Sequence, residues 1–209
     1  MPSIRFEPQC TTPKALVIMF HGVGSSPKSL RSLAEYLHQH CSEIEVRVPV
    51  GFSPSPLNPK GFHWFDITDI TEENRLDRVL DVMPAFDQLI RKEAQDAGVP
   101  LNKVILLGFS QGTIMSLEWF KQSRDAVAGI VGIAGRFAEL PKQTPQCNAP
   151  ICLIHGEQDS ISDPAHAQQS YDRLSALNIK TELNLLADTG HKVTAAMHLL
   201  CRDFIQRHI

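Results

Sequence analysis

One stretch near the middle of the chain, Lys103 to Met115, restricts the possible folds more than any other part of the sequence. Its first half, up to Phe109, is short and rich in leucine and β-branched residues, as expected of a strand buried on both faces of a sheet. It continues as Gly108-Phe109-Ser110-Gln111-Gly112 and then takes up helical apolar spacing. Glycines flank a serine in this way where a strand turns sharply into a helix and the nearby backbone leaves no room for side chains. The stretch therefore predicts a strand-turn-helix unit with Ser110 exposed at the turn.

The turn at Ser110 has two interpretations. It is either an ordinary glycine-containing turn, because Gly-x-Ser-x-Gly also occurs by chance, or a nucleophile elbow. The buried strand before it and the apolar-periodic helix after it are the context that a nucleophile elbow requires. The helix would also direct its N-terminal N–H groups toward the hydroxyl of Ser110, which favours a developing negative charge there. We therefore favour a catalytic Ser110.

Composition and charge describe an ordinary soluble globular protein. The 209 residues predict one domain, residues 1–209, and the chain is 43% hydrophobic and 21% charged with a net charge of -3. Lys and Arg are scattered, so there is no basic surface for nucleic acid or for an anionic membrane. The sequence favours a small-molecule substrate and leaves open whether the chain forms a homodimer.

The N-terminus and the cysteines predict a cytoplasmic protein. Residues 1–7 lack the apolar core of a signal peptide, and the apolar run Ala15 to Phe20 is too short to span a bilayer, so we expect no integral membrane segment. The five cysteines are widely spaced and include no Cys-x-x-Cys pair, which fits free thiols in a reducing compartment. We expect no metal and no cofactor. The alternative set of metal ligands, His155, Glu157 and His166, matches no zinc-binding helix motif.

Strands and helices are predicted to alternate along the whole chain, because short apolar runs alternate with segments of helical apolar spacing. The predicted strands are residues 3–8, 14–20, 45–50, 103–109, 126–134, 151–156 and 180–186; the predicted helices are residues 27–40, 71–98, the segment after Ser110, 164–177 and 191–208. Pro84 is expected to kink the second helix or to divide it near Leu80 to Met83. The alternation predicts an α/β fold with a mostly parallel central sheet and helices on both faces.

A long Gly- and Pro-rich segment, Gly51 to Phe65, is predicted to be a loop that forms one wall of the substrate site. The alternative is that its aromatic side chains pack on the core. The connections between strands and helices are short, so we expect no lid domain and an open groove that holds only a few acyl carbons. The expected substrate-binding residues are Phe52, Leu57, Phe62 and Trp64 on one wall and Phe137 and Leu140 on the other.

A serine nucleophile needs a base, usually a histidine that is held by a carboxylate. Functional residues of open α/β sheets follow the carboxyl ends of strands, and His191 directly follows the last predicted strand. The alternative role for His191 is to cap the last helix. Asp159, three residues after a strand that ends at Gly156, is the expected acid, since its rival Asp163 precedes Pro164 and fits a helix N-cap.

Two main-chain N–H groups are expected to form an oxyanion hole, because this fold takes one from the loop after an early strand and one from the residue after the nucleophile. His21-Gly22-Val23-Gly24 follows the predicted strand 14–20, so the donors are expected to be Val23 and Gln111. The glycines also suit a tight strand exit, and both roles are compatible. His21 is expected to orient or pack against its neighbours.

These motifs resemble, in order and spacing, the phospholipase/carboxylesterase family that includes acyl-protein thioesterases. The resemblance covers nearly the whole chain and rests on His21-Gly22-Val23-Gly24, Trp64-Phe65-Asp66, Gly108-Phe109-Ser110-Gln111-Gly112, His155-Gly156-x-x-Asp159 and Gly190-His191. Two further segments, 70–75 and Gly135-Arg136-Phe137, look closest to the bacterial YpfH-type esterases of that family. Ser25 and Ser162-Asp163 depart from the usual family residues at the border of the acyl site.

The resemblance implies a lidless α/β-hydrolase fold with Ser110, Asp159 and His191 at the catalytic positions and Val23 and Gln111 at the oxyanion positions. It implies a serine hydrolase that cleaves carboxylic esters, or thioesters, of short-to-medium acyl chains through an acyl-Ser110 intermediate. Two alternatives remain at this point. One is an acyl-protein thioesterase or lysophospholipase that acts on long acyl chains, and the other is a non-catalytic protein that uses this fold to bind a ligand.

Overall fold

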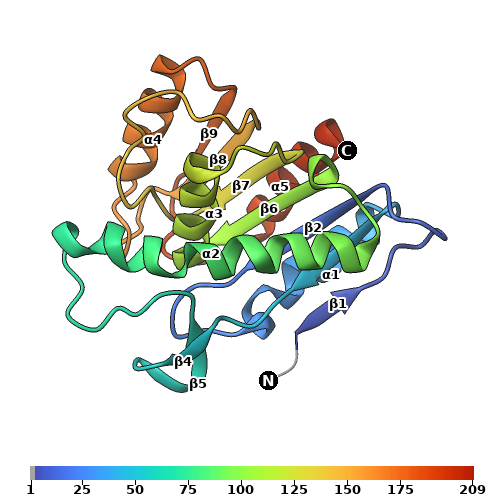
Figure 1. The fold of residues 1–209 in the computed structure, drawn as a ribbon, viewed down its shortest axis with the longest axis horizontal. Coiled ribbons are helices and arrows are strands. Elements are labelled where there is room, and N and C mark those ends of the chain that lie inside the picture. Colours follow the sequence, from blue (N-terminus) through green and yellow to red (C-terminus); the bar gives the residue numbers. More distant parts are fainter. Residues whose placement is uncertain (1–2) are drawn as a thin grey trace.

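A seven-stranded sheet in the order β1-β3-β2-β6-β7-β8-β9 forms the centre of the computed structural model, which describes residues 3–209 (Figure 1). Neighbouring strands are parallel except at one edge, where β1 runs antiparallel to β3. This confirms the mostly parallel sheet that the alternating pattern predicts. The strands are β1 (Ile4–Phe6), β2 (Ala15–Phe20), β3 (Ile44–Val48), β6 (Val104–Phe109), β7 (Gly129–Ile133), β8 (Ile151–Gly156) and β9 (Thr181–Leu186).

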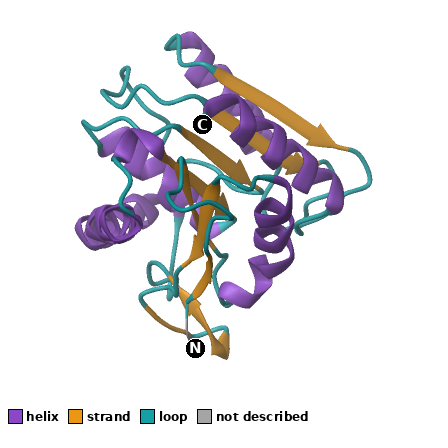
Figure 2. Cartoon of the chain, turned by 90° about the vertical axis from the view of Figure 1, so that its right-hand side faces the viewer, coloured by secondary structure: helices purple, strands orange, loops and turns teal. Residues whose placement is uncertain are grey.

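Helices cover both faces of the sheet, as Figure 2 shows. The helices α1 (Arg31–His40) and α5 (Ala195–His208) pack on one face, and α2 (Glu72–Ala97), α3 (Gln111–Gln122) and α4 (Ala165–Ala176) pack on the other. Successive side chains of a strand point to opposite faces, so Leu16 and Ile18 of β2 join one hydrophobic core while Val17 and Met19 join the other. The sheet is therefore buried on both sides, as its continuous apolar runs require.

The long helix α2 remains a single helix of 26 residues, so the predicted division near Leu80 to Met83 is wrong. Thr71 caps its start by accepting a hydrogen bond from the main-chain N–H of Asn74, whose side chain in turn accepts one from the main-chain N–H of Thr71. Gly98 ends it in the left-handed conformation. Pro84 lies on the exposed side of the helix, where water can hydrate the carbonyl group that loses its helical partner.

The segment from Gly51 to Phe65, predicted as a loop, contains a two-stranded hairpin outside the main sheet. Its strands are β4 (Ser53–Ser55) and β5 (Asn58–His63) (Figure 1). Phe62 fastens the hairpin to the loop after β2, because its main-chain N–H donates to Ser25 and its carbonyl oxygen accepts from Gly24. The contact requires a glycine at position 61, where a Cβ atom would lie 2.2 Å from the carbonyl oxygen of Gly24.

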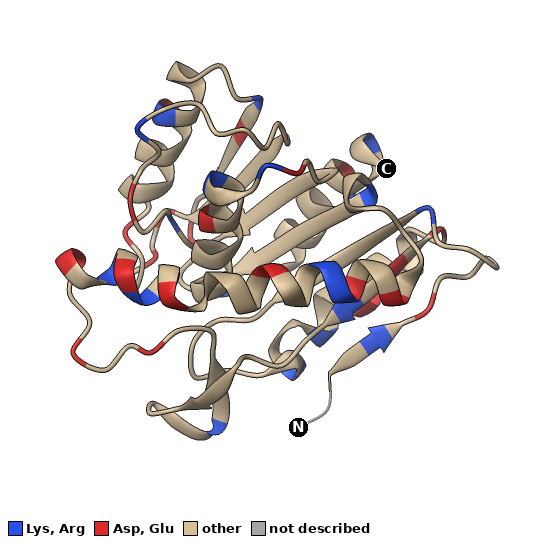
Figure 3. Cartoon of the chain, in the orientation of Figure 1, with Lys and Arg blue, Asp and Glu red and all other residues tan. Residues whose placement is uncertain are grey.

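The last predicted helix begins later than its apolar spacing indicates. Thr194 caps α5 by accepting a hydrogen bond from the main-chain N–H of Met197, so residues 191–193 belong to the preceding loop. Among residues 3–209, no helix is both long enough and apolar enough to cross a membrane. Acidic and basic side chains alternate along α2 without forming a patch of one sign, as Figure 3 shows.

Candidate active site

Ser110 occupies a strained turn between β6 and α3. Its φ of 54° and ψ of -113° lie in a region that residues other than glycine rarely adopt. The two flanking glycines are sterically required, because a Cβ at Gly108 would lie 2.3 Å from the main-chain nitrogen of Thr113 and one at Gly112 would lie 2.1 Å from the carbonyl oxygen of Phe20. The geometry is that of a nucleophile elbow.

The side chains of Ser110, His191 and Asp159 form one chain of hydrogen bonds. The Nε2 atom of His191 lies 3.0 Å from the Oγ of Ser110, and its Nδ1 atom lies 2.7 Å from the Oδ2 of Asp159. With Nδ1–H donating to the carboxylate, Nε2 is free to accept the proton of the serine hydroxyl. The three residues come from loops that follow β6, β8 and β9 at the carboxyl edge of the sheet.

The carboxylate of Asp159 is buried but well stabilised in its ionised form. Burial raises its pKa, but hydrogen bonds from the main-chain N–H of Ser162, from His191 and from the main-chain N–H of Ile161 outweigh burial, and the net effect is a lowered pKa. Both main-chain donors lie 2.9 Å from Oδ1, which leaves Oδ2 for His191. Asp159 is thus fixed as an acceptor.

His155, which sequence reasoning did not place in this site, holds the loop that carries Asp159. Its buried Nε2–H donates to the carbonyl oxygen of Ser162 at 2.8 Å, and the same nitrogen lies 3.2 Å from the Oδ2 of Asp159. The only sequence signal is the spacing His-Gly-x-x-Asp, which puts a histidine at the buried end of β8. His155 is a positioning residue for the carboxylate.

Asp163, the rival for the role of the acid, has a different partner. Its Oδ1 accepts a hydrogen bond of 2.9 Å from the main-chain N–H of Ala165, at the start of α4. This is the capping role that its position before Pro164 predicts. The structure therefore brings Asp159, and not Asp163, to His191.

The main-chain N–H groups of Val23 and Gln111 have no recorded acceptor within residues 3–209, and both residues line the same cavity as Ser110. Gln111 begins α3, so its N–H is one of the free donors at a helix N-terminus. Its side chain accepts from the main-chain N–H of Trp64 and donates to the carbonyl oxygen of Phe65, both at 2.8 Å. The two N–H groups are thus available for an oxyanion.

His21 is buried and serves the loop beside Val23. Its Nε2 accepts a hydrogen bond from the main-chain N–H of Gly51 at 3.1 Å, so Nδ1 carries the proton and donates to the carbonyl oxygen of Gly22 at 2.8 Å. Burial lowers the pKa of His21, which favours this neutral form. Its contacts agree with the expected orienting role.

A cavity of about 290 Å³ opens beside Ser110. Its apolar lining residues are Val23, Phe65, Ile67, Ile114, Ala134 and Ile161, and its charged or titratable lining residues are Glu72, Arg75, Arg136, Asp163 and His166. In this second group, sequence reasoning placed only Asp163 at the border of the acyl site and did not assign the other four residues to that site. The residues come from segments far apart in the chain, and only the fold brings them together.

None of the six expected wall residues, Phe52, Leu57, Phe62, Trp64, Phe137 and Leu140, lines this cavity within the described range 3–209. Trp64 and Phe137 are buried in the core, and Leu140 borders a separate depression with Lys121 and Gln143. The Nε1–H of Trp64 donates to the carbonyl oxygen of His21, and Phe52 packs edge-on against the Trp64 ring. Within the segment Gly51 to Phe65, Trp64 thus packs on the core, whereas Phe65 is buried and also lines the cavity.

A metal site at His155, Glu157 and His166 has no structural support. In the described part of the chain, residues 3–209, no three His, Cys, Asp or Glu side chains are grouped so that they could hold a metal ion. The Nε2–H of His155 instead donates to the carbonyl oxygen of Ser162, and the Nε2 of His166 lies 3.5 Å from the Nη1 of Arg136.

Comparisons with known proteins agree with this geometry. Residues 4–209 match the model of a family described as Phospholipase/Carboxylesterase. Esterase YpfH of Escherichia coli (strain K12) is 35% identical over 178 residues, which cover 85% of this chain and 76% of that protein. Acyl-protein thioesterase 1 of Yarrowia lipolytica is 27% identical, and the match covers 94% of this chain and 89% of that protein.

A crystal structure of esterase PE8 has the same fold. It superposes with a TM-score of 0.93 over 100% of this chain and 99% of that chain, at 22% sequence identity. The fold and the family resemblance that the sequence motifs predict are both confirmed. The chain belongs to the phospholipase/carboxylesterase family of α/β-hydrolases and is a carboxylesterase-type serine hydrolase.

Proposed function

We propose that this protein hydrolyses carboxylic esters of short-to-medium acyl groups through an acyl-Ser110 intermediate. The single observation that carries the proposal is the hydrogen-bond chain from Ser110 through His191 to Asp159 beside a cavity that Val23 and Gln111 also line. The cavity volume, about 290 Å³, lies at the lower end of the usual range for ligand sites, and this supports a short acyl group over a long one.

In the proposed reaction, the Oγ of Ser110 attacks the ester carbonyl carbon while its proton moves to the Nε2 of His191. The carbonyl oxygen becomes an oxyanion, which accepts hydrogen bonds from the main-chain N–H groups of Val23 and Gln111. When the tetrahedral intermediate collapses, His191 returns the proton to the leaving alcohol oxygen and the acyl group stays on Ser110. Water repeats the sequence, which releases the carboxylic acid and restores the serine.

The same steps cleave a thioester, with sulfur as the leaving atom. Acyl-protein thioesterases are among the relatives, and no feature of the triad separates the two leaving groups. A long acyl chain would have to extend beyond the cavity onto the surface, so the long-chain alternative has less support. The non-catalytic alternative offers no reason for three side chains that are aligned for proton transfer.

Labelling with a fluorophosphonate tests the proposal, because only an activated serine reacts stoichiometrically with this probe. We expect one label per chain in the natural protein and in Ser175→Ala, a control at an exposed serine on α4, and none in Ser110→Ala. His191→Ala should lose both labelling and hydrolysis of ethyl butyrate. Stoichiometric labelling of folded Ser110→Ala would contradict the assignment, and hydrolysis by that variant would do so as well.

A further inference from the structure

The cavity beside Ser110 has an apolar wall and a charged wall. Ile114 and Ala134 are neighbours of the nucleophile, since the N–H of Ile114 donates to the carbonyl oxygen of Ser110 and the residue before Ala134 accepts from the N–H of Ser110. The charged wall comes from the start of α2, which supplies Glu72 and Arg75, and from Arg136 after β7. An acyl group attached to Ser110 would therefore meet apolar side chains first and charged side chains beyond them.

The two arginines are held in place by one carboxylate. The Nη2 of Arg136 donates to both carboxylate oxygens of Glu72, at 2.6 and 2.7 Å, and the Nη2 of Arg75 donates to Oε1 at 2.7 Å. The Arg75 and Arg136 side chains are only 18% and 16% exposed, whereas that of Glu72 is 64% exposed. The carboxylate is thus the group that faces water, while the guanidinium groups are shielded, which strengthens their interactions.

The charged wall has more donors than acceptors. Both carboxylates of the cavity, Glu72 and Asp163, already accept hydrogen bonds from within the protein. On the donor side, the Nε of Arg75 and the Nδ1 of His166 are buried without a partner among residues 3–209, and no hydrogen bond is recorded for the Nε of Arg136 in the same range. A ligand group rich in acceptors fits this arrangement better than one rich in donors.

The formal charges of the cavity balance, so the local arrangement decides which ligand fits. Arg75 and Arg136 are opposed by Glu72 and Asp163, and burial together with the charge of Arg136 lowers the pKa of His166, which favours its neutral form. One carboxylate oxygen of Asp163 accepts from the start of α4, and each arginine keeps N–H groups that Glu72 does not use. A carboxylate is the group that a guanidinium binds best, often through two parallel hydrogen bonds.

The acyl part of the substrate, and not the leaving group, would occupy this cavity. His191 gives its proton to the leaving atom, so the leaving group lies on the histidine side of Ser110. The cavity is lined by Ser110 and by the two expected oxyanion donors, but His191 is absent from its lining within residues 3–209.

We propose that the enzyme prefers half-esters of short dicarboxylic acids, whose acyl chain ends in a free carboxylate that binds Arg136 and Arg75. This inference rests on the proposed esterase function and specifies its substrate class. The reaction stays an ordinary hydrolysis, in which the half-ester and water give the dicarboxylate and the alcohol. The volume of about 290 Å³ limits the acyl chain to a few methylene groups between the two carbonyl carbons.

Matched substrates test this preference in the natural protein. Monoethyl succinate and ethyl succinamate have the same shape, but only the first carries a terminal carboxylate; the glutarate and adipate pairs extend the series. Hydrolysis is followed by acid release at constant pH. We expect kcat/KM for at least one half-ester to exceed that for its amide by about tenfold or more, because hydrogen bonds to charged groups are stronger than those to neutral ones.

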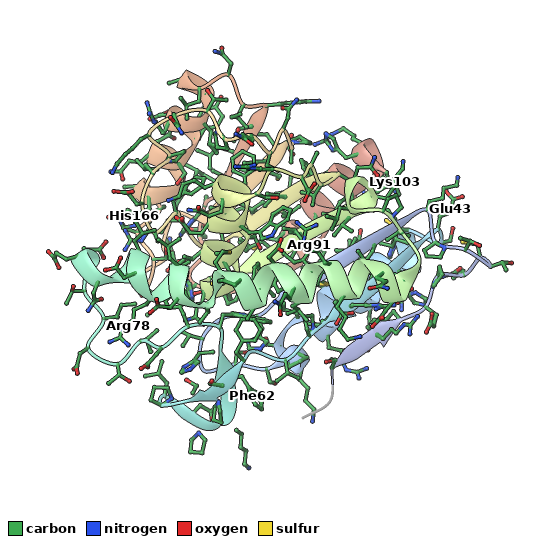
Figure 4. All side chains as sticks on the ribbon, viewed as in Figure 1. Glu43, Phe62, Arg78, Arg91, Lys103 and His166 are labelled. Carbon is green, nitrogen blue, oxygen red and sulfur yellow. The ribbon has the colours of Figure 1, made fainter. Side chains whose placement is uncertain are left out.

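Substitution of Arg136 tests whether the preference for half-esters comes from the charged wall. We expect Arg136→Gln to lower the ratio of kcat/KM for the preferred half-ester to kcat/KM for its amide by about tenfold, since only the half-ester carries the charge that Arg136 binds. The control Arg78→Gln also removes a positive charge from this region, but Arg78 does not line the cavity and lies on the opposite side of α2 from His166 in Figure 4. It should preserve the preference.

The outcomes separate this inference from the proposed function. If the natural protein hydrolyses ethyl butyrate but treats half-esters and amides alike, the inference is wrong and the esterase function stands; if it hydrolyses no ester, the proposed function fails. If Arg136→Gln does not fold, the natural protein is instead assayed at increasing salt concentrations. The KM of the half-ester should then rise with ionic strength while that of the amide does not, and equal responses would overturn the inference.

Discussion

The Nε2 of His155 lies 2.8 Å from the carbonyl oxygen of Ser162, and this contact closes the loop that presents Asp159 to His191. The N–H of Ser162 in turn donates to the Oδ1 of Asp159. His155, which does not line the cavity beside Ser110, therefore fixes the direction of the carboxylate, and through it the orientation of the imidazole.

Replacing His155 should impair turnover more than substrate binding. We expect His155→Leu, which removes the donor, to lower kcat by about 10- to 100-fold with little change in KM, because a misplaced catalytic group loses most of its effect. His155→Gln retains an N–H donor and should recover much of the rate. Steady-state kinetics on ethyl butyrate provide the measurement. Equal losses of kcat in both variants would show that His155 acts through packing and not through its hydrogen bond.

The acid should be identified by comparing two asparagine variants. Asp159→Asn leaves the imidazole without a carboxylate and favours its wrong tautomer, so kcat should fall by up to about 10⁴-fold, as in serine proteases. Asp163→Asn should cost about 1 kcal/mol of stability or less, since asparagine also caps helices. The assay uses ethyl butyrate, which has no charge to interact with Asp163. A larger loss of rate in the Asp163 variant would transfer the role of the acid to that residue.

Activity should depend on acyl length with an early maximum. Each methylene that is buried against Ile114 and its apolar neighbours contributes about 0.8 kcal/mol, but a longer chain must displace water from the shielded Arg75 and Arg136. We therefore expect kcat/KM for p-nitrophenyl esters to peak between about C2 and C8. The series is measured below the critical micelle concentration of each ester. A continued rise to C16 would instead favour a protein-deacylating or lysophospholipase role.

The ion pairs of Glu72 should stabilise the protein in a pH-dependent way. The hydrogen bond from Arg136 is the main reason that the pKa of Glu72 falls from 4.5 to about 2; burial opposes this fall, and the hydrogen bond from Arg75 and the charges of both arginines add to it. A carboxylate whose pKa is lowered by folding stabilises the folded state above its unfolded pKa and loses that effect as the pH falls through the folded pKa. The stability advantage over Glu72→Gln should therefore be constant near pH 7 and shrink between pH 4.5 and about 2.

The difference in unfolding free energy between the natural protein and Glu72→Gln should be within about 1 kcal/mol, because the Glu72 side chain is 64% exposed and water screens its interactions. Urea unfolding from about pH 7 to about pH 3 measures it. An advantage that stays the same across this range would show that Glu72 acts through packing and not through its charge.

The sequence predicts that the side chains of the proposed triad lie together, because each one follows a strand. Ser110, Asp159 and His191 are far apart in the chain, but the carboxyl ends of parallel strands lie at one edge of the sheet, so topology alone brings the three together. Capping chemistry then separates the two aspartates, since Asp163 already has a partner at the start of α4. Local rules therefore predict the hydrogen-bonded arrangement of these side chains.

The acyl cavity could not be predicted in the same way. Aromatic side chains in a Gly- and Pro-rich segment can face a substrate or pack on the core, and the deciding partner of Trp64 is the carbonyl oxygen of His21, 43 positions away. Arg136 and Glu72 are separated by 64 positions, and the strands β6 and β7 lie between them in the sequence. Neither lies in a periodic pattern that would associate the two. Such contacts depend on how the layers pack, which spacing along one element does not encode.

The attachment of the β4–β5 hairpin determines where this scaffold can accept new sequence. Phe62 ties it to the loop that carries Val23, and the side chain of Gln111 ties the residues after β5 to the start of α3. An insertion near either attachment would shift the two N–H groups that are expected to face the oxyanion. The hairpin tip at Leu57 is 65% exposed, and the side chain of its neighbour Asn58 donates one more hydrogen bond to the carbonyl oxygen of Gly24. A recognition loop grafted at Leu57, with Asn58 retained, would therefore disturb these attachments least.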